Sequence, residues 1–217
     1  MTALLSKEES IPAASGEVRI RSFCKPHEIR RCDFDSEFKA AGDYRSLYTR
    51  KQSLEMQARH PEANVVVALA QPQDIIGFGV LAYPEPDERW SDLGPGIMME
   101  IKVIEVARRW RSAGIGSHIL RMVVEDPRRE DKIFYMVGYS WTWDLPGTKM
   151  TAGEYRNMLM HLFASCGFQQ YQTNEPNVCL KPENVFMCRV GSHVSQTIID
   201  RFKWLRFGLR PWAWKVD

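Results

Sequence analysis

The stretch from Met98 to Glu125 constrains the fold of this 217-residue chain more than any other part of it. It begins with alternating apolar and charged residues, which is typical of a strand with one covered face. A turn with two glycines follows, and then an apolar stripe at helical spacing. Pro127 predicts the end of that helix. The residues of the stripe are Ile115, Ile119, Met122 and Val123.

The turn between this strand and this helix consists of small residues, as if the backbone must come close to another group. It runs from Arg111 to Gly116, with the sequence RSAGIG. A glycine turn that opens a helix presents unpaired N–H groups and the positive end of the helix dipole. The sequence therefore predicts a phosphate ligand, with a tight turn that binds nothing as the alternative.

The strand before the turn changes its phase partway along. Apolar residues occupy odd-numbered positions from Met99 to Val103, and even-numbered positions from Ile104 on. A slip of one residue predicts a β-bulge, which bends the strand and leaves a backbone group unpaired. A bent strand followed by a phosphate turn can hold an extended ligand that carries a pyrophosphate. The slip also puts three charged residues on one side of the strand: Glu100, Lys102 and Glu105.

The segment from Val106 to Gly116 resembles the acetyl-CoA signature of the GNAT acetyltransferases, Arg/Gln-x-x-Gly-x-Gly/Ala. This resemblance implies an α/β (α+β) fold with a mixed, mostly antiparallel sheet, a bulged central strand and flanking helices. It also implies acetyl-CoA as the co-substrate. The residues that it assigns to cofactor binding are Ile104, Val106, Arg111, Ser112, Ala113, Gly114, Ile115, Gly116 and Ser117.

Composition and cysteine usage limit the class of protein. Hydrophobic residues make up 44% and charged residues 26%, which is ordinary for a soluble globular protein. No apolar run approaches the length of a membrane span, and the first residues lack the pattern of a secretory signal. The five cysteines follow no metal-binding spacing, so we expect reduced thiols, a cytoplasmic protein and no metal. The formal charge of +2 neither favours nor excludes nucleic acid.

The rest of the chain predicts one GNAT domain over residues 17–192. Residues 1–16 are expected to form a flexible leader, and residues 193–217 an extra C-terminal helix with a basic aromatic tail packed on the domain. Further strands are expected over residues 17–23 (an edge strand), 65–70, 74–83, 132–139, 168–172 and 185–190, and helices over 151–164 and 194–207. Residues 71–74 predict a hairpin turn, residues 84–96 a loop, and residues 26–59 short helices of weak periodicity.

Further motifs narrow the resemblance to the acetoin-utilisation acetyltransferases, a group within the GNAT family. They are PEPDERW at 84–90, IEV at 104–106, WTWDL at 141–145, VSQ at 194–196 and LRF at 205–207. The similarity covers about residues 15 to 210. It implies a protein-lysine acetyltransferase that modifies and silences acetyl-CoA synthetase.

The reaction needs a base, because a lysine ammonium with a pKa of about 10.4 must lose a proton before it attacks a thioester. Glu100 lies eleven residues before Arg111, which is the spacing of the glutamate base in GNAT histone acetyltransferases. Glu105 is the rival candidate, and either carboxylate could instead be solvated or ion-paired. Where many GNATs carry a tyrosine acid, this chain has Phe163, so no general acid is identified. We expect oxyanion stabilisation from the N–H of Ile104 or Val106.

The loop after residues 132–139 lies where GNATs bind the acceptor, and it offers Trp141, Trp143 and Asp144. Exposed tryptophans favour a protein acceptor, whereas a polyamine site needs several carboxylates. The alternative is that both tryptophans are packed in the core. For the basic aromatic residues 201–215 we expect packing or a protein-docking surface rather than nucleic acid. The competing functions are a small-amine acetyltransferase and a CoA-binding partner that inhibits another enzyme.

Overall fold

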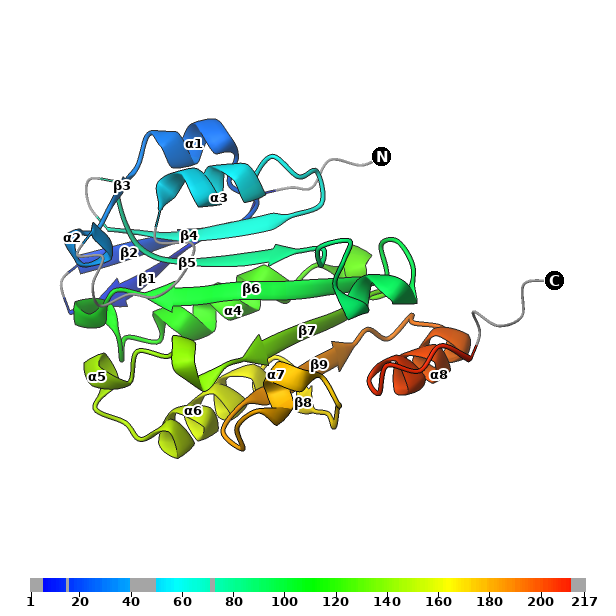
Figure 1. The fold of residues 1–217 in the computed structure, drawn as a ribbon. Coiled ribbons are helices and arrows are strands. Elements are labelled where there is room, and N and C mark those ends of the chain that lie inside the picture. The colour runs from blue at the N-terminus through cyan, green and yellow to red at the C-terminus, as the bar shows by residue number, and fades with distance from the viewer. Residues whose placement is uncertain (1–5, 15, 40–49, 71–72, 212–217) are drawn as a thin grey trace. The chain divides into compact units, whose positions relative to one another are not determined.

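The computed structural model describes residues 6–14, 16–39, 50–70 and 73–211, and Figure 1 shows their course. The chain divides into two compact units. The first unit comprises Met1–Ala82, Ile101–Glu125 and Asp144–Lys149, and the second comprises Tyr83–Glu100, Asp126–Trp143 and Met150–Asp217. The central strand β6 (Met98–Val106) gives its first three residues to the second unit and the rest to the first.

The first unit is built on strands that pair in the order β1, β2, β4, β5 and β6. The bounds are Glu8–Ala13 for β1, Gly16–Arg21 for β2, Asn64–Ala70 for β4 and Asp74–Ala82 for β5. The pairs from β1 to β5 are antiparallel, and the short β3 (Asp33–Phe34) pairs in parallel with β5. The predicted strands β2, β4, β5 and β6 are therefore confirmed.

Helix α4 (Ile115–Val124) packs on this sheet, with the predicted apolar stripe buried. Two glycines of β5 allow the close approach: a Cβ on Gly79 would lie 2.7 Å from Ile119 and 2.8 Å from Val123. Asn64 of β4 donates to the carbonyls of Met122 and Val123 at 2.9 and 3.0 Å, which ties the end of α4 to the sheet. The start of α4 is thereby held in a fixed place.

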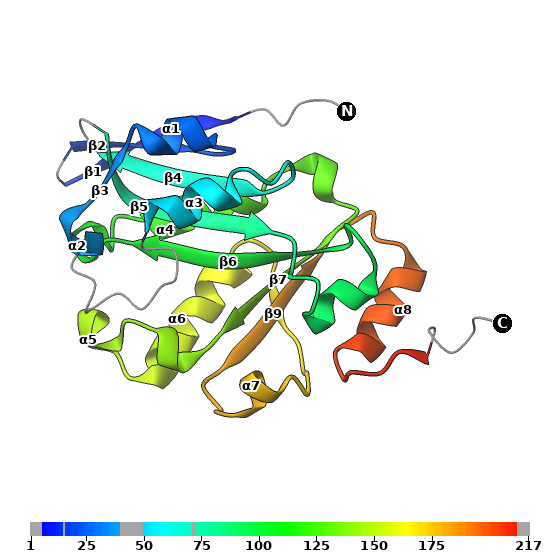
Figure 2. The same ribbon diagram turned by 45° about the horizontal axis from the view of Figure 1, so that its top comes forward.

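Shorter helices complete the first unit. They are α1 (Pro26–Arg30), α2 (Ser36–Lys39), α3 (Lys51–Gln57), the 3₁₀ turn η2 (Arg108–Trp110) and α5 (Leu145–Thr148). Helices α1 and α3 lie side by side (Figures 1 and 2). The prediction of short helices over residues 26–59 is confirmed for α1, α2 and α3, whereas Phe34 lies in the short strand β3 and residues 40–49 lie outside the described residues.

The second unit has its own strands. The first residues of β6 pair in parallel with β7 (Ile133–Gly138), and β9 (Val185–Val190) pairs antiparallel with β7 and with β8 (Gln169–Gln170). Its helices are α6 (Ala152–Ala164), α7 (Pro176–Cys179) and α8 (Gln196–Leu205), with the 3₁₀ turns η1 (Arg89–Leu93), η3 (Pro127–Arg129) and η4 (Ser140–Thr142). The predicted capping box of Thr151 and Glu154 opens α6.

An aromatic core joins the PEPDERW motif to the C-terminal helix. Trp90 of η1 stacks on Phe186 of β9, with ring centroids 4.4 Å apart, and both belong to a cluster with Phe202 and Leu205 of α8. Figure 2 shows α8 in orange; it packs against η1. The predicted extra helix therefore packs on the second unit through Phe202 and Leu205.

Two predictions at the start of the chain are wrong. Residues 8–13 form strand β1, not a flexible leader, and β2 is consequently not an edge strand. Only Ile11 of β1 is buried, and Pro12 is tolerated because β1 itself lies at the edge. This leaves almost no alternation for a sequence pattern to detect. Of the turn predicted at residues 71–74, residues 71 and 72 lie outside the described residues.

None of the helices in the described ranges combines the length and the apolar character that crossing a membrane requires.

Candidate active site

The cofactor loop, residues 111–117, has the backbone geometry of an anion-binding turn. Ser112 and Gly114 adopt left-handed φ values of 69° and 73°, and Gly114 is the N-cap of α4. A serine in this region is uncommon and often marks a functional site. No side chain caps α4, so its first N–H groups point out of the helix from an exposed loop. This arrangement fits the predicted phosphate ligand.

Gly116 is open on its side-chain face. A Cβ built there would meet only the Val106 side chain, at 3.9 Å, which is an ordinary contact. The fold therefore does not need glycine at this position for packing. A close approach of a ligand to the backbone supplies a reason for it.

The Arg111 side chain is turned toward the protein. Its guanidinium donates to the Val106 carbonyl at 3.0 Å, to Asp144 at 2.8 Å and to Glu105 at 3.2 Å. Two carboxylates therefore share its charge. The resemblance assigns Arg111 to the cofactor, and in the structure its guanidinium contacts Val106, Asp144 and Glu105.

Asp144 is held by two arginines. Its carboxylate accepts hydrogen bonds from Arg108 at 2.7 and 2.9 Å, from Arg111, and from the Gly147 N–H at 3.1 Å as the N-cap of α5. Burial alone would raise the pKa of Asp144, but the hydrogen bonds from Arg108 and Arg111 outweigh it and lower the pKa to about 2. The sequence assigned this carboxylate to the acceptor, whereas its oxygens already bind protein donors.

The carboxyl group of Glu105 has a strongly perturbed pKa. Burial raises its pKa to about 7, although the charge of Arg111 and the Val106 N–H act to lower it. The negative charge of Asp144 adds to the rise. A carboxylate with this pKa can accept a proton near neutral pH, as a general base must. We refer to Arg108, Asp144, Arg111 and Glu105 as the Arg–Asp network.

Glu100 has a different setting, in the second unit. It pairs in register with Tyr135 of β7, whose hydroxyl donates to Glu88 at 3.2 Å. Burial first, and then the charges of Glu100 and Glu88, raise the pKa of Tyr135 above its usual range. Burial together with Glu175, Glu100 and Glu88 raises the pKa of Tyr139 to about 12. These carboxylates and phenols form a negatively charged group that suits a cationic acceptor.

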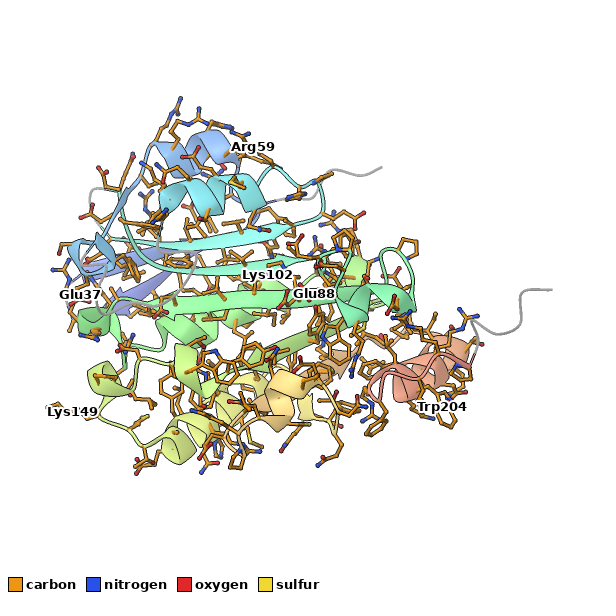
Figure 3. The ribbon with its side chains drawn as sticks, in the orientation of Figure 1. Glu37, Arg59, Glu88, Lys102, Lys149 and Trp204 are labelled. Atoms are coloured by element: carbon orange, nitrogen blue, oxygen red, sulfur yellow. The ribbon has the colours of Figure 1, made fainter. Side chains whose placement is uncertain are left out.

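Glu88 is a further carboxylate of this setting, and the sequence did not single it out. It lies in the PEPDERW motif, which carried the family resemblance but received no role. Its hydrogen bond to Tyr135 spans 47 residues, so only the fold brings the two together. Figure 3 labels Glu88 among the side chains drawn as sticks.

The two loop tryptophans lie outside the buried core. Trp141 is 36% exposed and stacks on Tyr139, with ring centroids 4.8 Å apart. Trp143 is half-buried and stacks on Tyr155 at 5.0 Å. The alternative that both tryptophans belong to the core is therefore wrong. Each indole is held flat against a phenol ring, which makes a rigid aromatic surface.

Other candidate groups have structural surroundings. Phe163 is buried and lies edge-on to Phe168 at 5.3 Å, so this position supplies no acid. His161 is exposed, and its Nδ1 pairs with the Asn157 carbonyl. Within the described ranges, no group of three or more His, Cys, Asp or Glu side chains could hold a metal ion.

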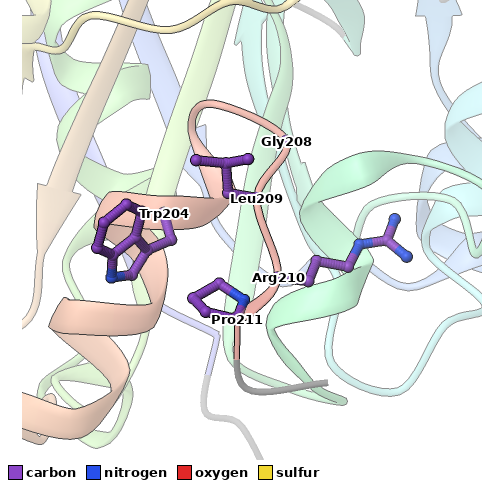
Figure 4. A pocket seen from close by; sticks show the side chains of 5 residues that line it. All are labelled: Trp204, Gly208, Leu209, Arg210 and Pro211. Atoms are coloured by element: carbon purple, nitrogen blue, oxygen red, sulfur yellow. The ribbon is translucent and has the colours of Figure 1, made fainter. Parts of the chain in front are cut away.

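The end of α8 carries a separate pocket of about 430 Å³. Figure 4 shows the residues that line it: Trp204, Gly208, Leu209, Arg210 and Pro211. Arg210 forms an ion pair with Asp92, and Arg206 lies over the rings of Tyr171, Phe202 and Phe207. These basic residues are engaged in packing and ion pairs. Trp212, Trp214 and Lys215 of the predicted tail lie outside the described residues.

The chain is similar over almost its whole length to known proteins. It is 31% identical over 199 residues to the acetoin utilization protein AcuA of Bacillus licheniformis, covering 92% of this chain and 93% of the relative. The AcuA protein of Bacillus subtilis is 30% identical, with 91% and 92% covered. No family model matches the chain.

Similarity to solved structures points to the same group of proteins. The crystal structure of the acetoin utilization protein from Exiguobacterium sibiricum gives a TM-score of 0.86 at 26% identity, covering 94% of this chain and 95% of that one. A GNAT phosphinothricin acetyltransferase from Sinorhizobium meliloti, solved in complex with AcCoA, gives a TM-score of 0.50 at 14% identity. The match covers 82% of this chain and 90% of that one, which shows a common fold.

The sheet, the uncapped α4 behind its glycine loop and these similarities define the class: the chain is an acetyl-CoA-dependent N-acetyltransferase of the GNAT type. The identity to the two Bacillus proteins extends over both units. Within that class, the chain belongs to the AcuA family of acetoin utilization proteins.

Proposed function

We propose that this acetyltransferase modifies a lysine on the surface of a folded protein, with acetyl-CoA synthetase as the first substrate to test. The observation that carries the proposal is the aromatic surface of the second unit, where Trp141 and Trp143 are each stacked on a tyrosine outside the core. Rigid, accessible tryptophans are typical anchors of protein interfaces. A small polar amine offers them no comparable contact.

For the co-substrate, we propose that the pyrophosphate of acetyl-CoA lies on the N–H groups of the cofactor loop. Support comes from the left-handed Ser112 and Gly114, the open face of Gly116 and the uncapped start of α4. The remaining predicted contacts are Ile104, Val106, Ala113, Ile115 and Ser117. The pyrophosphate is the anion that the helix dipole would favour.

The proposed reaction forms a bond between the lysine nitrogen and the acetyl carbon and breaks the thioester C–S bond. The lysine ammonium first gives a proton to a carboxylate of the protein. Glu105 is the better candidate because its pKa of about 7 suits proton uptake near neutral pH. Glu100 remains the rival, and its place beside Glu88 equally suits holding the ammonium before the reaction. The CoA thiolate leaves without an acid at position 163.

Acetylation would remove one positive charge from the target lysine. We propose that this lowers the activity of acetyl-CoA synthetase, because a lysine that contacts a phosphate or carboxylate needs its charge. The free thiols of the described cysteines fit a reducing, cytoplasmic location, where this enzyme would meet acetyl-CoA synthetase.

The test is to incubate the purified protein with acetyl-CoA and acetyl-CoA synthetase and to locate acetyl groups by mass spectrometry. Spermidine in a parallel reaction represents the small-amine alternative, and CoA in place of acetyl-CoA represents an inhibitor that acts by docking. We expect acetylation of one or a few lysines and a matching loss of synthetase activity. Faster acetylation of spermidine than of any protein offered, or inhibition with CoA alone, would contradict the proposal.

A further inference from the structure

The Arg–Asp network links three separate parts of the first unit. Asp144 caps α5, Arg111 begins the cofactor loop, and Glu105 lies on β6. Arg111 is the cation common to both carboxylates, at 2.8 Å from Asp144 and 3.2 Å from Glu105. The contact is packed tightly on the α5 side, since a Cβ on Gly147 would lie 2.1 Å from the Asp144 carboxylate.

The two carboxylates share Arg111 unequally. Asp144 is 8% exposed at its side chain and binds two guanidinium groups, whereas Glu105 has one longer hydrogen bond from Arg111. An arginine already held by one anion stabilises a second anion less than a free arginine would. The position of Asp144 therefore affects how readily Glu105 takes up a proton.

We propose that Asp144 is a positioning residue for acetyl transfer, which holds the Arg111 guanidinium between its own carboxylate and that of Glu105. The proposal rests on the assignment of Glu105 as the base. It gives the WTWDL motif a role in the cofactor unit in place of an acceptor contact.

Charged groups face Glu105 from two neighbouring segments of the first unit. Arg111 faces it from the cofactor loop and Asp144 from the start of α5, with Arg108 of η2 bound to Asp144 on its other side. On β5 the neighbour of the Glu105 backbone is Gly77, which has no charge. On β6 itself the nearest charged residue in sequence is Lys102.

Two substitutions should shift the titration of Glu105 in opposite directions. Asp144→Asn removes a negative charge and frees Arg111, so the pKa of Glu105 should fall by about one unit. Arg111→Gln removes the positive charge, so the pKa should rise by about one unit. If Glu105 is the base, the acidic limb of the kcat profile should move with it, to lower pH in the first variant and to higher pH in the second.

Asp126→Asn is a matched control. Asp126 is also a buried aspartate that caps a short helix, η3, and pairs with two arginines, Arg128 and Arg129. It has no contact with Glu105 in the described structure. Substitution of Asp126 should therefore change neither the titration of Glu105 nor the acidic limb of the kcat profile.

The experiment is a ¹³C NMR titration of labelled glutamate carboxyls in the full chain, together with pH–rate profiles measured with acetyl-CoA and a simple amine acceptor. The proposal is supported if the pKa of Glu105 and the acidic limb of the kcat profile both move down in Asp144→Asn and both move up in Arg111→Gln. Unshifted titrations with rates lowered equally at all pH values would show a purely structural role for Asp144. Shifted titrations with fixed pH limbs would exclude Glu105 as the base and the proposal with it, and would leave the choice of acceptor untouched. If Asp144→Asn does not fold, Arg111→Gln decides alone, because it leaves the Asp144 cap intact.

Discussion

At the residue scale, Asp144 shows what tertiary structure adds to a sequence motif. The WTWDL motif was visible in the sequence, and so was Arg111. Their pairing was not, because 33 residues separate them and the hydrogen bonds depend on where α5 begins. The same holds for Glu105, whose pKa follows from burial that a strand pattern does not reveal. From the sequence, the spacing to Arg111 favoured Glu100 as the base, whereas the raised pKa in the structure favours Glu105.

Asp144→Asn should destabilise the protein by about 2 kcal/mol at pH 7. Folding lowers the pKa of Asp144 from 3.8 to about 2, which means that the ionised carboxylate stabilises the folded state by that amount. Because the folded-state pKa lies below the unfolded value, the stabilisation is complete above about pH 5 and is lost as the pH falls through about 2. Urea unfolding of both proteins should show a gap that closes with acid. Asp200→Asn, in the exposed pair with Lys203, is the control and should change little. An equal gap at pH 7 and pH 2 would contradict the linkage.

Glu105→Gln should lower kcat at pH 7 by about 100-fold or more, as expected on removal of a general base, with acetyl-CoA affinity retained. The deficit should shrink at high pH, where the acceptor amine loses its proton to solvent. Glu100→Gln is the comparison and should raise KM for the acceptor more than it lowers kcat, because Glu100 lies with Glu88 and Tyr135. If Glu100→Gln loses kcat and Glu105→Gln does not, the base is Glu100.

At the scale of elements, long periodic segments were predictable and short ones were not. Helix α4 and strands β4 to β7 have enough apolar periods to fix their type, and their bounds agree with the prediction within two residues. Strand β1, with one buried residue, and the four-residue helices α5 and α7 carry no such signal. Their places are set by pairing with β2 and by capping side chains such as Asp144 and Glu175.

The start of α4 allows a clean test of cofactor binding. Gly116→Val should leave the fold intact, since only one atom lies near the added Cβ, but should block close approach of the pyrophosphate and weaken acetyl-CoA binding at least 10-fold. Gly114 is a poorer choice, because its φ of 73° strains any other residue. Gly153→Val is the matched control, as Gly153 is likewise the second residue of its helix, α6, with nothing near its Cβ. Calorimetry showing unchanged affinity for Gly116→Val would sink the assignment.

At the scale of the whole molecule, the family is established while the acceptor is a proposal. Similarity to the AcuA proteins covers nine-tenths of the chain, so it includes the aromatic surface as well as the cofactor loop. The general GNAT fold was predictable from the strand, turn and helix alone. In the second unit, Trp90 of the PEPDERW motif packs in the aromatic core, and Trp141 and Trp143 of the WTWDL motif stack on tyrosines.

The last prediction concerns that surface. Joint substitution of Trp141 and Trp143 by alanine should reduce acetylation of the protein acceptor by about 10-fold or more, since truncation of an interface tryptophan commonly costs 2 kcal/mol or more. Acetyl-CoA binding, which needs the cofactor loop of the other unit, should persist, and so should slow acetylation of a simple amine. Trp204→Ala is the control: this tryptophan of α8 is 51% exposed, lies away from the loop in sequence and is labelled in Figures 3 and 4. Loss of activity toward both acceptors would mean that the tryptophans support the fold of the site, and undiminished protein acetylation would mean that the acceptor docks elsewhere.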